Sequence, residues 1–246
     1  MIATLIARLT GRRYAIERSD IGYLMAKGGI PFLRGLGWSV LRLRRPSGLM
    51  LGPGIQFVQV GRLRLGRGVA IGGYGYIDCA ATQGLVFGDR VTLRERAWIQ
   101  SRSGLNERAV GLRIGSRSYI GPNAVIGLGG AVTIGEDVQI GAGLTITAES
   151  HEPGPAGDFV SGAVSRRGVT IGARCWLGNN VSILDGVEIG EGSVIGAGSI
   201  VTRSLPAYCV AVGAPAKVTR STTPPSSSTS SSAAAAAAIG PAQPGR

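Results

Sequence analysis

The residues best suited to chemistry gather in one segment of the chain, TAESHEPGPAGDFVSGAVSRRG, residues 147–168. It contains His151, the only histidine in the protein, flanked by Glu149 and Glu152. An imidazole titrates near neutral pH, so it can take a proton from a hydroxyl that attacks a substrate. Its other nitrogen then needs a partner, and either glutamate or a backbone carbonyl is a candidate. The segment is a candidate catalytic loop; the alternative is a loop histidine without a role.

Composition limits the partner and the compartment. The formal net charge of +12 predicts an anionic partner. No aromatic platform or recognised module accompanies that charge, so we expect no nucleic-acid partner. Cys79, Cys175 and Cys209 form no C-x-x-C pair, which argues against a disulfide framework or zinc knuckle and fits a reducing compartment. Without a bilayer-spanning apolar run or a signal-peptide pattern, the expected location is cytoplasmic.

Most of the chain repeats every six residues. A period of six is neither helical nor plain alternation, and it predicts short strands separated by tight corners. We expect the first, aliphatic residue of each hexad to point inward and the glycine after it to relax the backbone at the corner. Small fifth residues, Cys175 among them, are expected to pack inside. Aliphatic residues lead hexads at positions 114, 120, 126, 134, 140, 146, 171, 177, 183, 189, 195 and 201, with weaker copies at 65, 71, 77, 87, 93 and 99.

Three strands close one coil, and stacked coils bury an aliphatic column that one coil cannot bury alone. We expect about six coils between residues 60 and 203. The steps after Ile77, Ile99, Ile126 and Ile146 lengthen to 10, 15, 8 and 25 residues, and each residue belongs to the third strand of its coil. All four insertions are therefore predicted to leave from one edge, and insertions on one side of a solenoid often mark its binding face.

The last coils carry a set of specific motifs. GVTIGARCWLGNNVSILDGVEIGEGSVIGAGSIVTRSLPAYCVAVGAPAKV, residues 168–218, contains W-L-G, G-V-x-I-G, I-G-A-G-S-I-V-T and a closing G-x-P-A-K. This set resembles the hexapeptide-repeat acyltransferases, such as the maltose, galactoside, xenobiotic and capsule or colanic-acid acetyltransferases, over about residues 60–218. The resemblance implies an all-β fold, a left-handed parallel β-helix. It also implies a homotrimer with active sites between neighbouring subunits.

The resemblance further implies the site residues. His151 matches the base, and Trp176 matches a tryptophan that packs near the catalytic site. In the family, certain positions meet the pantetheine arm of acyl-CoA, and this chain has Asn179, Ala197 and Thr202 there. The family's basic positions near the nucleotide phosphates are matched by Arg203 and Lys217. The chemistry adds two expectations: the backbone N–H of Gly178 at a corner as an oxyanion donor, and Gly196, Ala197 and Gly198 as an uncrowded groove for pantetheine.

We therefore expect a CoA-dependent O-acetyltransferase of polysaccharide biosynthesis, with acetyl-CoA as donor and a sugar or saccharide–lipid intermediate as acceptor. The alternatives are N-acyl transfer to an amino sugar and a non-catalytic hexapeptide scaffold. Related zinc enzymes need three histidines, so no metal is expected. Where the maltose and galactoside enzymes hold sugar hydroxyls with Asn and Asp, this chain has Gly121 and Gly129. Asn123 is the nearest polar residue for acceptor binding.

Three segments divide the chain. Residues 1–50 form a basic amphipathic segment, which caps the solenoid or contacts a membrane through residues 30–45 at the inner face of the plasma membrane. Residues 51–220 form the β-helix with the catalytic loop 147–168. Residues 221–246 are low in complexity, rich in Ser and Ala, and are predicted to be disordered.

Overall fold

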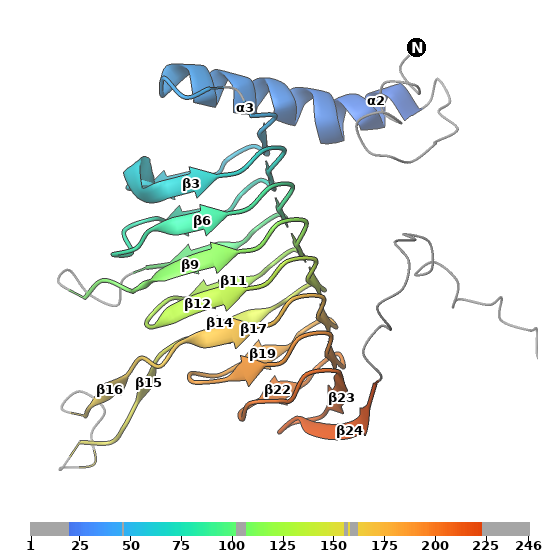
Figure 1. Ribbon diagram of the computed structural model, residues 1–246. Helices are drawn as coiled ribbons and strands as arrows, with labels where there is room; N and C mark the ends of the chain where they lie inside the picture. Colours follow the sequence, from blue (N-terminus) through green and yellow to red (C-terminus); the bar gives the residue numbers. More distant parts are fainter. Residues whose placement is uncertain (1–19, 46, 102–106, 155–156, 158–161, 223–246) are drawn as a thin grey trace, which may run out of the picture.

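The structure is a computed structural model that describes residues 20–45, 47–101, 107–154, 157 and 162–222. Short strands stack into a parallel β-helix, with a helical segment across one end and a hairpin projecting from the stack (Figure 1). The predicted tail beyond residue 222 lies outside the described residues. Within the described residues, no helix is long and apolar enough to cross a membrane.

Three sheets form the faces of the solenoid. Sheet A contains β1 (Met50–Leu51), β4 (Ala70–Ile71), β7 (Thr92–Leu93), β10 (Tyr119–Ile120), β13 (Gln139–Ile140), β18 (Trp176–Leu177), β21 (Val194–Ile195), β23 (Cys209–Val212) and β24 (Lys217–Ser221). Sheet B contains β2 (Gln56–Val58), β5 (Tyr76–Asp78), β8 (Trp98–Gln100), β11 (Val125–Gly127), β14 (Thr145–Thr147), β19 (Ser182–Ile183) and β22 (Ile200–Val201). Sheet C contains β3 (Leu63–Leu65), β6 (Leu85–Phe87), β9 (Gly111–Ile114), β12 (Ala131–Ile134), β17 (Val169–Ile171) and β20 (Glu188–Ile189).

The repeat and the coils coincide. The six strands of sheet C match the expected number of coils, and the first coil begins at Met50, ahead of the expected start at residue 60. Ile120, Ile140, Leu177 and Ile195 align strand by strand in sheet A, and all four are buried. Burying each such side chain contributes about 1.5–3 kcal/mol, which is why the coils are stable only when stacked.

The glycine in second place of each hexad has a different role from the expected one. It does not relax the backbone, because the left-handed residue of the corner is the fourth of the hexad, such as Arg117 (φ 63°) or Asn123 (φ 59°). A Cβ added to Gly115 would lie 2.5 Å from the backbone nitrogen of Glu136 in the next coil. Glycine is needed there because successive corners stack too closely for any side chain.

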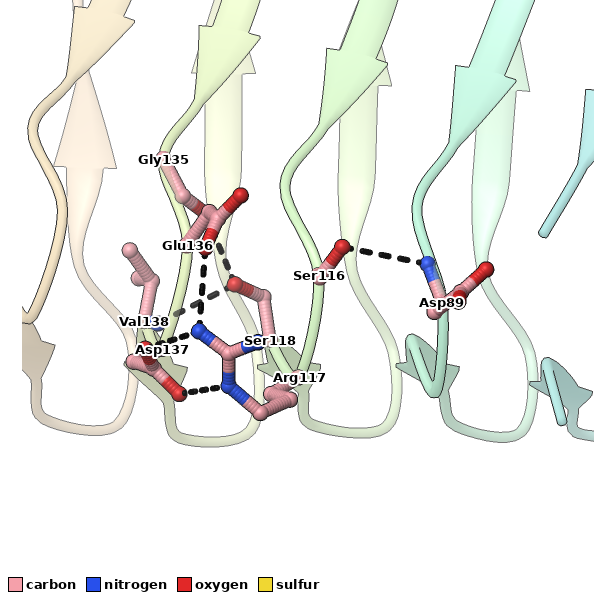
Figure 2. Close-up of polar contacts among 8 residues, drawn as sticks. All are labelled: Asp89, Ser116, Arg117, Ser118, Gly135, Glu136, Asp137 and Val138. Carbon is pink, nitrogen blue, oxygen red and sulfur yellow. Dashed lines mark hydrogen bonds and ion pairs between the residues drawn. The ribbon is translucent and has the colours of Figure 1, made fainter. Parts of the chain in front are cut away.

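The edge between sheets C and A is regular and closed by polar contacts. In Figure 2 the guanidinium of Arg117 reaches Asp137 on the next corner, with Nε 2.7 Å from Oδ1, and also Glu136. Ser118 Oγ, fifth in its hexad, donates to the carbonyl of Gly135 at 2.7 Å and accepts from the N–H of Val138. Hydroxyls can therefore replace apolar residues inside the corners, because each finds a backbone partner.

The opposite edge, between sheets B and C, carries the insertions. Each long connection follows a strand of sheet B, namely β5, β8, β11 and β14. The prediction that all insertions leave from one edge is therefore confirmed. The longest connection contains the hairpin of β15 (Ser150–His151) and β16 (Val164–Ser165), which projects from the stack in Figure 1.

A helical run covers the N-terminal end of the solenoid. It consists of α2 (Asp20–Leu24), the π-helical turn η1 (Met25–Gly29) and α3 (Ile30–Leu41), and a short helix η2 (Val60–Arg62) precedes β3. Gly35 of α3 lies so close to the backbone of Leu49 that a Cβ would overlap it. Trp38 packs against Phe57, with 5.8 Å between ring centroids. This packing makes α3 a lid over the first coil.

Candidate active site

His151 sits on the hairpin at the edge between sheets B and C. β15 pairs antiparallel with β16, so that His151 lies opposite Val164. The next pair extends the hairpin, since the N–H of Glu152 donates to the carbonyl of Ala163 at 2.9 Å. His151 is exposed, and within the described residues its imidazole makes no hydrogen bond or ion pair. Its ring is therefore accessible to a substrate.

Asp185 anchors the return strand of this hairpin to the solenoid. Its buried carboxylate accepts hydrogen bonds from the N–H of Gly168 at 2.8 Å, the N–H of Arg167 at 3.2 Å and the hydroxyl of Ser165 at 3.0 Å. Burial by itself would raise the pKa of Asp185, but these donors lower it below the usual aspartate value. The base of the loop is thus held by an ionised, fully hydrogen-bonded carboxylate.

Arg166 ties together the two longest insertions. Its guanidinium pairs with Glu149 just before β15, Nε to Oε2 at 3.4 Å, and with Glu107 at the end of the insertion before β9. Gly129 lies beneath this contact, because a Cβ there would meet the Cβ of Glu149 at 2.5 Å. The described end of that insertion is therefore joined to the candidate catalytic loop at Glu107.

The two glutamates next to His151 are placed differently from the expected partners. Glu149 belongs to the ion pair with Arg166, and Glu152 is exposed. Within the described residues no hydrogen bond joins either carboxylate to His151, so the group that orients the imidazole stays a prediction. Sequence reasoning missed Asp185, Arg166 and Glu107. Only the D-G turn at 185–186 hinted at an Asx-type backbone contact.

Two of the three residues that match pantetheine contacts, Asn179 and Ala197, lie at a different corner, between sheets A and B. Asn179 is exposed there, and its side-chain Oδ1 accepts the N–H of Ala142 in the previous coil at 2.8 Å. Ala197 is exposed one coil further on, and within the described residues its N–H has no hydrogen-bond partner. The stack of corners ends at this point, so the N–H of Ala197 is an accessible backbone donor.

One expected role is wrong. Gly178 cannot donate to an oxyanion, because its N–H already donates to the carbonyl of Ile195 at 2.8 Å and the residue is buried. Gly178 instead admits the next corner, since a Cβ would lie 2.6 Å from the nitrogen of Ala197. Gly196, one coil further on, is only half-buried. Its N–H is also unavailable, because it donates to the carbonyl of Ala211.

The remaining predicted residues fall on other parts of the surface. Trp176 stands on the outer face of sheet A with 57% of its surface exposed. Lys217 begins β24, beside Val212 at the C-terminal edge of that sheet. Thr202 and Arg203 follow β22 and lie on the same edge as His151, two coils further along sheet B. Asn123 is exposed at the corner between sheets A and B, in line with Asn179 rather than with His151.

A single chain therefore does not bring the predicted site together. His151, Thr202 and Arg203 lie at one end of the strands of sheet B, whereas Asn179 and Ala197 lie at the other end. Sheet B stands between them, and its strands of two or three residues span about 7–10 Å. The two groups face different sides of the solenoid.

Two other features bear on the site's chemistry. Cys175 is buried, and burial raises the pKa of its thiol, so it packs inside the coil and is not a nucleophile.

A cavity of about 440 Å³ lies at the N-terminal end, lined by residues that include Tyr23, Lys27, Tyr74 and Arg94, and none of the predicted site residues lines it. Among the described residues, no group of three or more His, Cys, Asp or Glu side chains is placed to hold a metal ion.

Family models match the coils on both sides of the hairpin. The model described as bacterial transferase hexapeptide (six repeats) matches residues 168–203. The model described as hexapeptide repeat of succinyl-transferase matches residues 111–148. The predicted resemblance to hexapeptide-repeat acyltransferases is thereby confirmed.

Individual proteins show the same likeness. Galactoside O-acetyltransferase of Escherichia coli (strain K12) is 54% identical over 52 residues, which are 21% of this chain and 26% of that protein. The chain thus spans about a quarter of the length of the curated relatives it matches. A solved galactoside acetyltransferase in complex with coenzyme A is 31% identical over 56% of this chain and 64% of that chain, with a TM-score of 0.48.

A more distant solved structure supports the fold. A mutant of AntD, an N-acyltransferase from Bacillus cereus in complex with dTDP and coenzyme A, is 17% identical over 71% of this chain and 81% of that chain, with a TM-score of 0.50. Together with the parallel sheets and the repeats, this likeness confirms the predicted left-handed parallel β-helix.

Proposed function

We propose that this chain, whose coils carry the bacterial hexapeptide transferase repeat, is a CoA-dependent acyltransferase with His151 as its general base. One observation carries the proposal. The only histidine of the chain is exposed on a hairpin that is anchored to the solenoid by Asp185 and Arg166, between two segments that match transferase repeats. A loop histidine without a role would not require such anchoring.

The reaction follows from the groups present. His151 takes the proton of an acceptor hydroxyl as its oxygen attacks the thioester carbonyl, and general-base help of this kind contributes about 10²–10⁴-fold. The tetrahedral intermediate collapses to the ester and CoA thiolate, which His151 reprotonates. Donor and acceptor are bound together, so no covalent acyl-enzyme is required. Because Gly178 is excluded as the oxyanion donor, another group must fill that role.

Acetyl-CoA is the proposed donor. The N–H of Ala197 at the end of its stack of corners is suited to an amide of the pantetheine arm, and the exposed Arg203 and Lys217 are suited to its phosphates. Asn179 keeps its amide NH₂ for the same arm while its oxygen serves Ala142. The coenzyme A complex of the solved galactoside acetyltransferase supports this choice of donor.

The complete site belongs to two neighbouring copies of the chain. Since sheet B separates His151 from Asn179 and Ala197 in one chain, a homotrimer that sets the hairpin of one copy against sheet A and the A–B corner of the next would join them. Trp176, with 57% of its surface exposed on sheet A, would then be covered by the neighbour.

The proposed acceptor is a hydroxyl of a sugar or of a saccharide carried on a lipid, as in polysaccharide biosynthesis. The name of the Escherichia coli relative, a galactoside O-acetyltransferase, supports a sugar hydroxyl. N-acyl transfer to an amino sugar is a second candidate, which the AntD likeness in fold leaves open, and His151 serves either nucleophile. A cytoplasmic location is part of the proposal, and Cys79, Cys175 and Cys209 are all free and buried.

Calorimetric titration with acetyl-CoA tests the proposal first, with CoA and ATP as controls. Binding of acetyl-CoA and CoA but not ATP is expected, followed by thiol release in a screen of sugar and amino-sugar acceptors. No binding of acetyl-CoA, and none of a longer acyl-CoA, would instead assign the chain to non-catalytic hexapeptide scaffolds.

A further inference from the structure

The outer face of the N-terminal lid is apolar. α3 turns Gly35 and Ser39 toward the first coil, and both are buried. The residues on the opposite side of the helix, at spacings of three and four, are therefore directed away from the solenoid. These are Ile30, Leu33, Val40 and Leu41, with 42%, 60%, 58% and 85% of their surfaces exposed. Figure 1 shows the helical run lying across the end of the stack, so among the described residues this face points away from the coils.

The apolar face continues beyond α3. Phe32 and Leu43 are exposed beside it, and Ile21, Tyr23 and Met25 are exposed on the preceding turns. Gly35 packs tightly against the backbone of Leu49, and Trp38 packs against Phe57. These two contacts prevent α3 from turning its apolar face inward. The exposure is therefore imposed by the fold.

The charge around this face is mainly cationic, and Asp20 at the start of α2 is the acidic residue of the helical run. Residues 21–77 contain eight cationic residues and no Asp or Glu: Lys27, Arg34, Arg42, Arg44, Arg45, Arg62, Arg64 and Arg67. Four are engaged: Lys27 pairs with Glu95 and Arg67 with Asp89, while Arg44 and Arg62 donate to backbone carbonyls. Arg34 and Arg45 are exposed, and within the described residues neither has a carboxylate partner. Arg42 lies over the ring of Trp38 at 4.8 Å, with its charge still exposed.

We infer that this end of the solenoid binds an anionic lipid surface, with α3 lying flat in the headgroup region. An apolar helix face bordered by arginines is the form that peripheral membrane helices take, and each cation near an anionic surface adds to the attraction. Charge complementarity selects this partner. A second copy docking face to face would set the same arginines against each other, which opposes association. The inference concerns the end of the solenoid and does not depend on acyl transfer.

Vesicle co-sedimentation of the full chain tests the inference. Vesicles of phosphatidylcholine with phosphatidylglycerol are expected to bind the protein, and vesicles of phosphatidylcholine alone are expected to bind at least tenfold less. Added salt should weaken the binding, because exposed charges are screened. Equal binding to both vesicles, or none to either, would overturn the inference.

Matched variants locate the contact. Leu33→Glu with Val40→Glu should lower the bound fraction at least tenfold, whereas Val212→Glu with Val218→Glu, at the other end of the solenoid, should leave it unchanged. Arg34→Gln with Arg45→Gln should lower binding severalfold without touching the packed side of α3, compared with Arg108→Gln and Arg113→Gln elsewhere. Circular dichroism confirms folding of each variant. Self-association that depends on Leu33 and Val40, without vesicle binding, would assign the face to a second copy and contradict the inference.

Discussion

Two edges of the same solenoid show how a repeat protein separates stability from chemistry. Between sheets C and A, corners of equal length stack directly, with Arg117 on Asp137 and Ser118 on Gly135. Between sheets B and C, connections of unequal length leave the stack, and His151 stands on the longest. On the regular edge the exposed guanidinium of Arg117 is held in ion pairs with the next corner, whereas the irregular edge presents a histidine on an anchored hairpin. In the proposed function the regular coils act as a rigid base and the insertion supplies the reacting group.

The comparison predicts its largest effect at His151. Replacing His151 by Ala should lower acyl transfer about 10²–10⁴-fold, because the general base is lost, while acetyl-CoA binding and thermal unfolding stay unchanged. Steady-state thiol release and calorimetry measure the two quantities. Retention of the wild-type rate would remove His151 from the mechanism and leave the irregular edge without a base.

Asp185 holds the base of the hairpin on the irregular edge against the stacked coils. Asp185→Ala leaves the buried N–H of Gly168 without its acceptor, which costs about 1–3 kcal/mol, and it also loses the contacts to Ser165 and Arg167. We expect lower stability together with faster proteolysis inside residues 147–168. Denaturant unfolding and mass spectrometry of the fragments report both. Unchanged cleavage of the loop would show that Asp185 does not hold the hairpin.

Gly115 tests the regular edge by itself. Gly115→Ala places a Cβ 2.5 Å from the nitrogen of Glu136, and overpacking of this kind costs about 1–3 kcal/mol. The rate at His151 should change little, because the corner lies on another edge. Gly61→Ala is the control, since open space surrounds that position. Equal stability of the two variants would contradict the close-stacking role of second-position glycines.

The pH dependence of stability should reflect Asp185. Its folded pKa is lowered below 3.8, so the unfolded chain binds more protons in that range and stability falls as the pH drops. The contribution is complete above the usual aspartate value and is lost as the pH falls through the lowered folded value. Asp185→Asn should flatten this part of the curve. Urea unfolding of both proteins across the acidic range measures the difference.

The smallest effect is expected for the exposed ion pair of the regular edge. Arg117→Gln removes the pair with Asp137, and an ion pair this exposed to solvent contributes little to stability. A small change in thermal stability and an unchanged rate would complete the contrast with His151. A large loss of activity would show that the two edges are coupled.

Sequence reasoning was strongest where the structure is local. A six-residue period predicts which residues point inward, because one strand and one corner decide the direction of each side chain. Ile120, Ile140 and Leu177 are buried as expected, and so are the small fifth residues Ser118 and Cys175. The common edge of the insertions also followed from spacing, since every long step occurs after the same strand of its coil.

Reasoning failed where two coils meet. The hexad predicts conformational freedom as the role of the corner glycine, yet the backbone of the next coil excludes a side chain there. Gly178 was expected to offer an N–H that the next coil already uses. Arg166 and Glu107 are 59 residues apart, so nothing in a hexad predicts that they pair.

The sequence by itself therefore determined the coil, the direction of its side chains and the edge that carries the histidine, because a short repeat contains all the information needed for one turn. Only the tertiary structure decided what each corner does. Stacking brings residues of different coils to the same place, and it placed Asp185 beneath the hairpin and put Asn179 and His151 on different sides of sheet B. These placements depend on the packing of whole coils, whose contacts the hexad pattern does not contain.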